Sequence, residues 1–137
     1  MTFEDILTRV ARALERAQVP YMLTGSVASS AHGKPRSTRD IDIVIAPNSE
    51  QLRELIQQFP GSAYYADEQQ ALQALAHRSQ FNVIDSATGW KVDFIIAKTS
   101  EYARTALSRR KKLIIGDTLL SVASPEDVIV PKWNGQN

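Results

Sequence analysis

The stretch TRDIDIVI, residues 38–45, places two aspartates one residue apart inside an otherwise apolar run. The isoleucines of this run alternate as they do in a buried strand, although aspartate is depleted in strands. Because side chains alternate across a strand, Asp40 and Asp42 project to one face and the isoleucines project to the other. Two carboxylates on one face repel each other unless a cation lies between them.

A second stretch of the same form, KVDFII, spans residues 91–96. Val92, Phe94 and Ile96 pack one way, and Asp93 points the other way with Ile95. If this strand lies beside the first, Asp40, Asp42 and Asp93 converge. Three carboxylates with open coordination positions suit Mg²⁺ or Mn²⁺, which take their remaining ligands from water and substrate phosphates. Two such ions, roughly 3.5–4 Å apart, would clamp the attacking and leaving oxygens of an in-line phosphoryl transfer.

The aspartates also have a purely structural interpretation. Asp40 could begin an exposed strand, while Asp42 and Asp93 could pair with arginines such as Arg36 or Arg39. A lone D-x-D matches often by chance, because short motifs do. The pattern of the two strands by itself leaves both interpretations open.

Gly25 and Ser26 stand where a predicted strand, residues 21–24, is followed by a short helix over residues 27–31. Glycine permits a tight turn and lets the backbone approach a ligand. Free N–H groups at a helix start, with a serine hydroxyl beside them, form an anion site suited to a triphosphate. A glycine turn with a serine N-cap explains the same residues without a ligand. The phosphate interpretation gains weight because the three aspartates accompany it.

Composition is that of one ordinary globular domain spanning residues 1–137. The net charge of +1 provides no global field for nucleic acid or an anionic membrane. The absence of cysteine excludes disulfides and thiolate metal sites. The amphipathic N-terminus is no signal peptide and no apolar run is long enough to cross a bilayer, so we expect a cytoplasmic protein without a membrane partner.

Periodicity and turn residues predict an α/β or α+β domain in which helices flank a mixed central sheet. Asn48 with Gln51 and Asp67 with Gln70 mark helix starts, and DSATG, residues 85–89, marks a hairpin. The first predicted helix begins at residue 3 and is stopped by Val19-Pro20. The other predicted helices span 27–31, 48–59, 67–77, 100–109 and 125–130. The predicted strands span 21–24, 40–45, 81–84, 90–96, 112–115 and 119–123.

Together, Gly25-Ser26, DIDIVI and KVDFII resemble the signature of the nucleotidyltransferase superfamily that includes DNA polymerase β and kanamycin nucleotidyltransferase. The longer run YMLTGSVASSAHGKPRSTRDIDIVI, residues 21–45, is similar to bacterial stand-alone nucleotidyltransferase-like proteins related to AbiEii-type toxins. The shared features are Gly-Ser, a small-residue helix, His-Gly, Arg-x-Thr and D-I-D. The resemblance covers roughly residues 20–130.

The resemblance implies a minimal polymerase-β-like fold, two divalent ions with a bound NTP, and transfer of a nucleotidyl group to a hydroxyl with release of pyrophosphate. By this resemblance Asp40, Asp42 and Asp93 would hold the metal, Asp93 also serving as a base. Gly25 and Ser26 would hold the β- and γ-phosphates, with Arg36 and Arg39 as phosphate neighbours. His32 is interpreted as a loop anchor. The acceptor could be tRNA, a protein hydroxyl or a small molecule.

Two other enzyme classes use D-x-D. Haloacid-dehalogenase-type phosphatases need a threonine or similar residue two places after the second aspartate, where this chain has Val44. Nucleotide-sugar glycosyltransferases use D-x-D to hold Mn²⁺, but the Gly-Ser helix start and the short chain fit them poorly. A further alternative keeps the fold with weak or no catalysis, as a toxin–antitoxin or other interaction partner.

The chain departs from the family pattern after SPEDVIV, residues 124–130, because relatives continue with a lysine-bearing segment and further helices. Here Lys132 could match that lysine, but Pro131 breaks the helix. We therefore expect a domain shortened after about residue 130, with a possible homo-oligomer covering exposed apolar surface. The basic run RRKK, residues 109–112, fits a solvated helix end or an RNA contact, and Trp90 fits the core or its rim.

Overall fold

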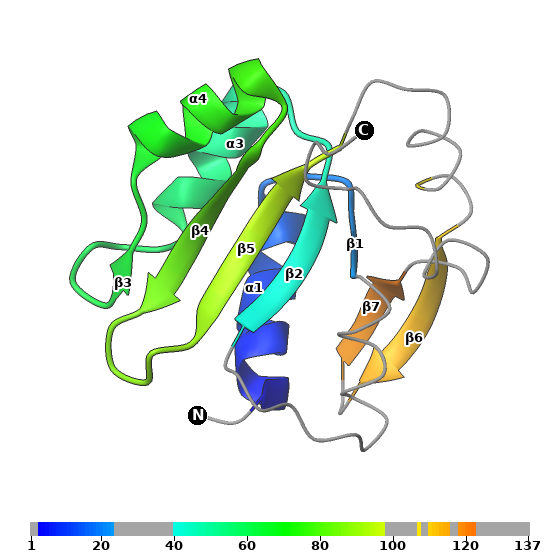
Figure 1. The fold of residues 1–137 in the computed structure, drawn as a ribbon. Helices are drawn as coiled ribbons and strands as arrows, with labels where there is room; N and C mark the ends of the chain where they lie inside the picture. Colours follow the sequence, from blue (N-terminus) through cyan, green and yellow to red (C-terminus); the bar gives the residue numbers. More distant parts are fainter. Residues whose placement is uncertain (1–2, 24–39, 98–106, 108–109, 116–117, 123–137) are drawn as a thin grey trace.

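The computed structural model describes residues 3–23, 40–97, 107, 110–115 and 118–122 (Figure 1). Its helices are α1 (Phe3–Arg16), α3 (Ser49–Gln57) and α4 (Glu68–His77). Its strands are β1 (Tyr21–Leu23), β2 (Asp40–Ile45), β3 (Tyr64–Tyr65), β4 (Gln80–Asp85), β5 (Lys91–Ile96), β6 (Lys111–Ile115) and β7 (Thr118–Val122). No helix in these described segments is long and apolar enough to cross a membrane.

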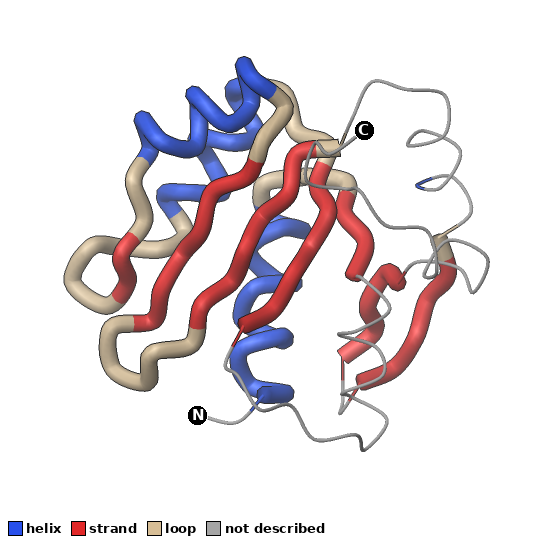
Figure 2. Tube along the Cα trace, in the orientation of Figure 1, coloured by secondary structure: helices blue, strands red, loops and turns tan. Residues whose placement is uncertain are grey.

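One mixed sheet contains all seven described strands, in the order β3-β4-β5-β2-β1-β7-β6 (Figure 2). The central pair, β2 and β5, is parallel, while β4 and β1 run antiparallel to β5 and β2. At the other side β1 is parallel to β7, which forms an antiparallel pair with β6. This arrangement confirms the predicted α/β class with a mixed central sheet.

The helices pack on one face of the sheet, as Figure 1 shows for α1 behind β2 and β5. The alternate apolar residues of the two central strands form the core against this layer, and Phe94 is fully buried. Phe94 stacks on Phe81 of β4 at 5.2 Å between ring centroids and also approaches Phe59 after α3. Burying each large apolar side chain contributes roughly 1.5–3 kcal/mol, so this face provides most of the stability.

Short local signals place the helix ends. Asn48 caps α3 with a complete capping box, because its side chain accepts from the Gln51 amide at 2.8 Å and the Gln51 side chain accepts from its amide at 2.9 Å. Asp67 caps α4 by accepting from the amides of Gln69 and Gln70. The helix ends at His77 and is followed by the C-cap residue Arg78, which adopts the left-handed conformation with φ of 53°. Both predicted helix starts are thus confirmed.

The β4–β5 hairpin is also confirmed, with Gly89 at φ of +80° inside the predicted turn. The two-residue strand β3 was not predicted, since a pair of tyrosines is too short to display an alternating pattern. The predicted helices over 27–31, 100–109 and 125–130 lie outside the described residues, apart from Leu107, which is helical and buried.

Candidate functional site

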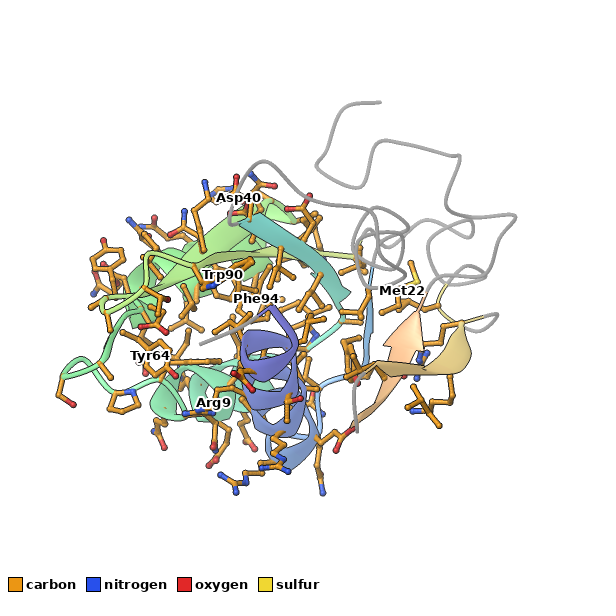
Figure 3. The ribbon with its side chains drawn as sticks, turned by 90° about the horizontal axis from the view of Figure 1, so that it is seen from below. Arg9, Met22, Asp40, Tyr64, Trp90 and Phe94 are labelled. Carbon is orange, nitrogen blue, oxygen red and sulfur yellow. The ribbon has the colours of Figure 1, made fainter. Side chains whose placement is uncertain are left out.

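The face of the sheet away from α1 carries the aspartates, and Figure 3 shows Asp40 on that side and Phe94 on the helix side. The parallel register of β2 and β5 makes Asp42 and Asp93 direct neighbours. The antiparallel register of β4 and β5 places Asn82 on the other side of Asp93. One row of polar side chains, Asp42–Asp93–Asn82, therefore crosses three strands, which lie about 4.8 Å apart.

Rows before and after this one have a different chemistry. In the row before it, Asp40 of β2 is the register partner of Lys91 of β5, so a cation lies among the acids. In the row after it, Met22, Val44 and Ile95 lie side by side and belong to a second buried apolar cluster with Ala97 and Leu107. Among the described residues, the acids thus lie in the first halves of β2 and β5, next to this buried apolar cluster.

The environment of Asp93 shows how strongly the acids interact. Burial raises the pKa of the Asp93 carboxyl above its ordinary value, and Lys91 opposes that shift. The charge of Asp42, a hydrogen bond with the Asp42 side chain and the charge of Asp40 each raise this pKa further. Without a bound cation, the Asp93 carboxyl beside Asp42 therefore holds its proton to a higher pH than an ordinary aspartate does. A divalent cation between the two carboxyl groups would reverse this preference.

The structure places the predicted site residues unequally. Asp42 and Asp93 are in contact, and Asp40 is half-buried one row away on the same face. Within the described residues, no three acidic or histidine side chains are close enough to form a ready metal site. The joint binding of one ion by Asp40, Asp42 and Asp93 stays a prediction. Gly25, Ser26, Arg36 and Arg39, together with His32 and Lys132, lie outside the described residues.

Two residues of this site were not singled out from the sequence. Lys91 stands two positions before Asp93 and shares its strand face, a signal that the alternating pattern already contained. Asn82 has no comparable signal, because its position beside Asp93 depends on the β4–β5 register. The positive charge of Lys91 partly offsets the negative charge of the aspartates, and Asn82 places a neutral hydrogen-bonding group beside Asp93.

The other residues noted in the sequence lie away from the aspartates. Trp90 is half-buried and packs against the main core, as expected of a core or rim residue. Of the basic run, Arg110 and Lys112 lie near the start of β6, where the Lys112 ammonium donates to the Ser121 hydroxyl at 3.0 Å. A basic contact with RNA stays a prediction.

Comparison with known proteins was made at the level of sequence and of structure. No protein-family model and no curated protein matches the sequence. A proposed nucleotidyltransferase from Thermotoga maritima is similar in structure, with a TM-score of 0.55 and 17% identity over 89% of this chain and 77% of that one. An antigenic nucleotidyltransferase-like protein from Paracoccidioides brasiliensis has a TM-score of 0.55 and 19% identity, over 90% of this chain and 61% of that one.

Both similarities extend over most of this chain, and at these sequence identities they concern the fold alone. They concern the arrangement of the sheet and its helices, which is what the D-x-D and Gly-Ser motifs had predicted. The chain therefore has the fold of nucleotidyltransferase-like proteins.

Proposed function

We propose that the chain is a metal-dependent nucleotidyltransferase, which moves a nucleoside monophosphate from an NTP to an acceptor hydroxyl. The observation that carries this proposal is the contact between Asp42 and Asp93 on the polar face of two otherwise buried strands. A protein that needed these strands only for stability would gain more from apolar residues at both positions, because parallel central strands are ordinarily covered on both faces.

The donor set fits Mg²⁺ or Mn²⁺. Asp42 and Asp93 offer adjacent carboxylate oxygens, with Asp40 close by on the same face. Mg²⁺ in phosphoryl-transfer sites is usually held by one or two carboxylates plus water and substrate phosphates, so a preformed three-ligand cage is not needed. Two ions, when bound with the NTP, would supply charge neutralisation at its phosphates.

In the proposed step, the acceptor oxygen forms a bond to the α-phosphorus as the bond to the bridging pyrophosphate oxygen breaks. Asp93 takes the proton of the acceptor hydroxyl, the role that the family resemblance implies for it, because a carboxylate within reach of a hydroxyl can act as a general base. Pyrophosphate leaves with the bonding electrons. By the family resemblance Gly25 and Ser26 hold the β- and γ-phosphates, with Arg36 and Arg39 near them, and Lys91 adds a positive charge beside the acids.

The test is transfer of label from each of the four α-³²P-labelled NTPs, with Mg²⁺, to total cellular RNA, to lysate protein and to small hydroxyl compounds. We expect one acceptor class to become labelled. Asp42→Asn should abolish the transfer, and Asp67→Asn should retain it, since asparagine caps a helix as well as aspartate does. The absence of labelled acceptor with every NTP, or equal labelling by Asp42→Asn, contradicts the proposal and favours a non-catalytic interaction partner.

A further inference from the structure

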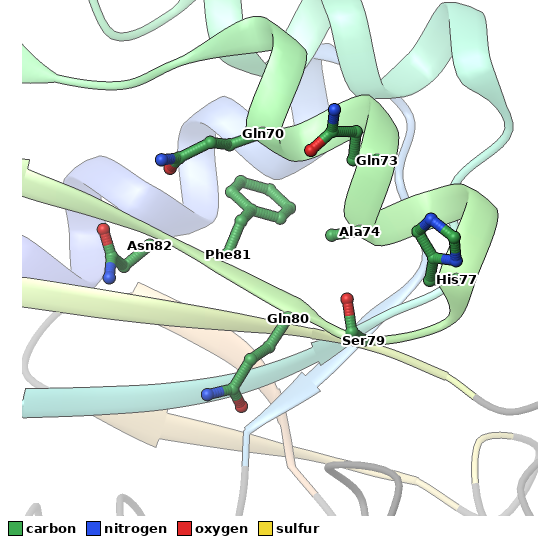
Figure 4. A pocket seen from close by; sticks show the side chains of 8 residues that line it. All are labelled: Gln70, Gln73, Ala74, His77, Ser79, Gln80, Phe81 and Asn82. Atoms are coloured by element: carbon green, nitrogen blue, oxygen red, sulfur yellow. The ribbon is translucent and has the colours of Figure 1, made fainter.

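A hollow of about 370 Å³ lies between α4 and β4, close to the polar row (Figure 4). The side chains that matter for its chemistry are Gln70, Gln73 and His77 of α4 and Gln80, Phe81 and Asn82 of β4. Its volume is in the range of pockets that bind small molecules. Residues from both faces of β4 line it, because it wraps around the edge of that strand.

This edge of β4 is open where the hollow lies. On that side β3 pairs only with Ile84 and Asp85, so no other described strand lies beside the Gln80–Val83 half. The Ser79 carbonyl accepts from the Ile96 amide at 2.9 Å and the Asp85 amide donates to the Trp90 carbonyl at 2.8 Å. Since backbone groups alternate in direction along an antiparallel strand, those of Gln80 and Asn82 point away from β5, toward the hollow.

The lining is polar but carries almost no charge. Four carboxamides, from Gln70, Gln73, Gln80 and Asn82, are joined by a serine hydroxyl and by His77, the only titratable side chain among the described lining residues. Carboxamides both donate and accept hydrogen bonds, and asparagine and glutamine pair with the edge of a base in this way. The ring of Phe81 extends from β4 toward α4 in Figure 4 and gives the hollow an apolar floor.

The position of the hollow relative to the acids indicates which substrate it would take. Asn82 lines it and is also the register partner of Asp93, the proposed base. A ligand in the hollow thus lies beside the proposed base, where an acceptor that presents a hydroxyl to Asp93 would have to lie.

We propose that this hollow binds the nucleobase of the acceptor, so that the acceptor is a nucleoside or an RNA end whose ribose hydroxyl reaches Asp93. The inference rests on the proposed function for the hydroxyl transfer, whereas recognition of the base needs neither metal nor NTP. A nucleobase is uncharged, flat and rich in hydrogen-bonding groups, so it matches the carboxamides, the backbone groups of Gln80 and Asn82 that face away from β5, and the phenyl floor. A phosphate or a carboxylate would meet no lysine or arginine side chain among the described lining residues.

The experiment is a two-dimensional NMR titration of the full chain in EDTA with adenosine, guanosine, cytidine and uridine, and with N-acetylserinamide as a protein-like hydroxyl. We expect at least one nucleoside to shift the side-chain amide signals of Gln73 and Asn82. Gln73→Ala and Asn82→Ala should each weaken its binding roughly two- to tenfold, the loss of one neutral hydrogen bond. Gln69→Ala is the matched control, because Gln69 lies on α4 and is exposed but does not line the hollow. The Gln69→Ala variant should bind the nucleoside with the affinity of the parent.

The outcomes separate this inference from the proposed function. If the parent binds Mg²⁺-NTP but no nucleoside shifts these signals, or N-acetylserinamide alone does, the nucleobase site is overturned and the transfer proposal stands. Nucleoside binding that neither Gln73→Ala nor Asn82→Ala weakens also overturns it. If nucleosides bind in the hollow but no NTP binds with Mg²⁺, the transfer proposal fails and the acceptor role fails with it.

Discussion

The two faces of β2 and β5 differ sharply in polarity, although alternate residues of the same two strands form them. Toward the helices, Ile41, Ile43 and Ile45 are at most 1% exposed and Phe94 is 0% exposed. Away from the helices, Asp42 and Asp93 are only half-buried, and burial together with the charge of Asp42 raises the pKa of Asp93. The helix-covered face therefore contributes stability, whereas the acidic part of the other face contributes less, as expected of strands that also hold a functional cluster.

The largest effect is expected on the helix-covered face. Phe94→Ala should lower the free energy of unfolding by about 3–5 kcal/mol, because it removes a fully buried ring that stacks on Phe81 and leaves a cavity. Urea denaturation followed by circular dichroism measures this loss, and Phe94→Leu should recover much of it. A cost below about 1 kcal/mol would show that this face does not dominate stability.

The next largest effect concerns ligand-linked stability of the polar face. In EDTA, Asp42→Asn should melt at the parent's temperature or above it, because it removes repulsion from Asp93. With Mg²⁺ and NTP at a hundredfold excess over Kd, the parent should gain roughly 2.7 kcal/mol and the variant should lose most of that gain. If Asp42 were instead paired with an arginine, its loss would cost about 3–5 kcal/mol. A variant that melts well below the parent in EDTA, with no metal-dependent shift in the parent, would falsify the site.

A smaller effect is expected where a charge lies on the helix-covered side. The guanidinium of Arg9 lies 5.1 Å from the centroid of Phe59 and 5.5 Å from that of Tyr64, and it donates to the Gln58 carbonyl. Arg9→Met should lower the free energy of unfolding by about 1–2 kcal/mol through loss of these contacts. Arg12→Met, an exposed position on the same helix, should change it by less than about 0.5 kcal/mol. Equal effects of the two variants would remove the special role of Arg9.

The smallest expected effect is a change with pH in the stability that Asp93 contributes, and its sign tells whether the carboxylate is stabilised in the fold. Because the pKa of Asp93 is raised in the folded protein, its contribution to stability is fully present below the unfolded pKa of an aspartate. That contribution is lost as the pH rises through the higher folded value. In EDTA, Asp93→Asn should therefore gain stability relative to the parent as the pH rises through this window.

Chemical denaturation of both proteins from pH 3 to pH 8 tests this difference, and the carboxylates that do not interact with Asp93 cancel because they are common to both. A parent that gains stability over Asp93→Asn with rising pH would mean that the Asp93 carboxylate is stabilised in the fold. In that case the acids are satisfied by partners and are not poised for a cation.

Local sequence determined much of this protein. The strand Asp40–Ile45 was predicted to the residue, and both capped helices began where Asn48 and Asp67 indicated. The side of each strand on which an aspartate lies also followed from alternation alone. These features depend on residues only a few positions apart, because capping hydrogen bonds and the alternation of side chains along a strand are local.

What only the tertiary structure decided is which distant strands became neighbours and in what register. The pairing of Asp42 with Asp93 and of Asp40 with Lys91 joins strands separated by other elements, and the pairing of Asn82 with Asp93 depends on the register of the β4–β5 hairpin. A slip of one residue between β2 and β5 would have put the acids on opposite faces. The edge strand β3 and the hollow beside β4 likewise arise from how α3 and α4 pack on the sheet. Register and packing are set by the burial of the whole core, which no single stretch of sequence contains.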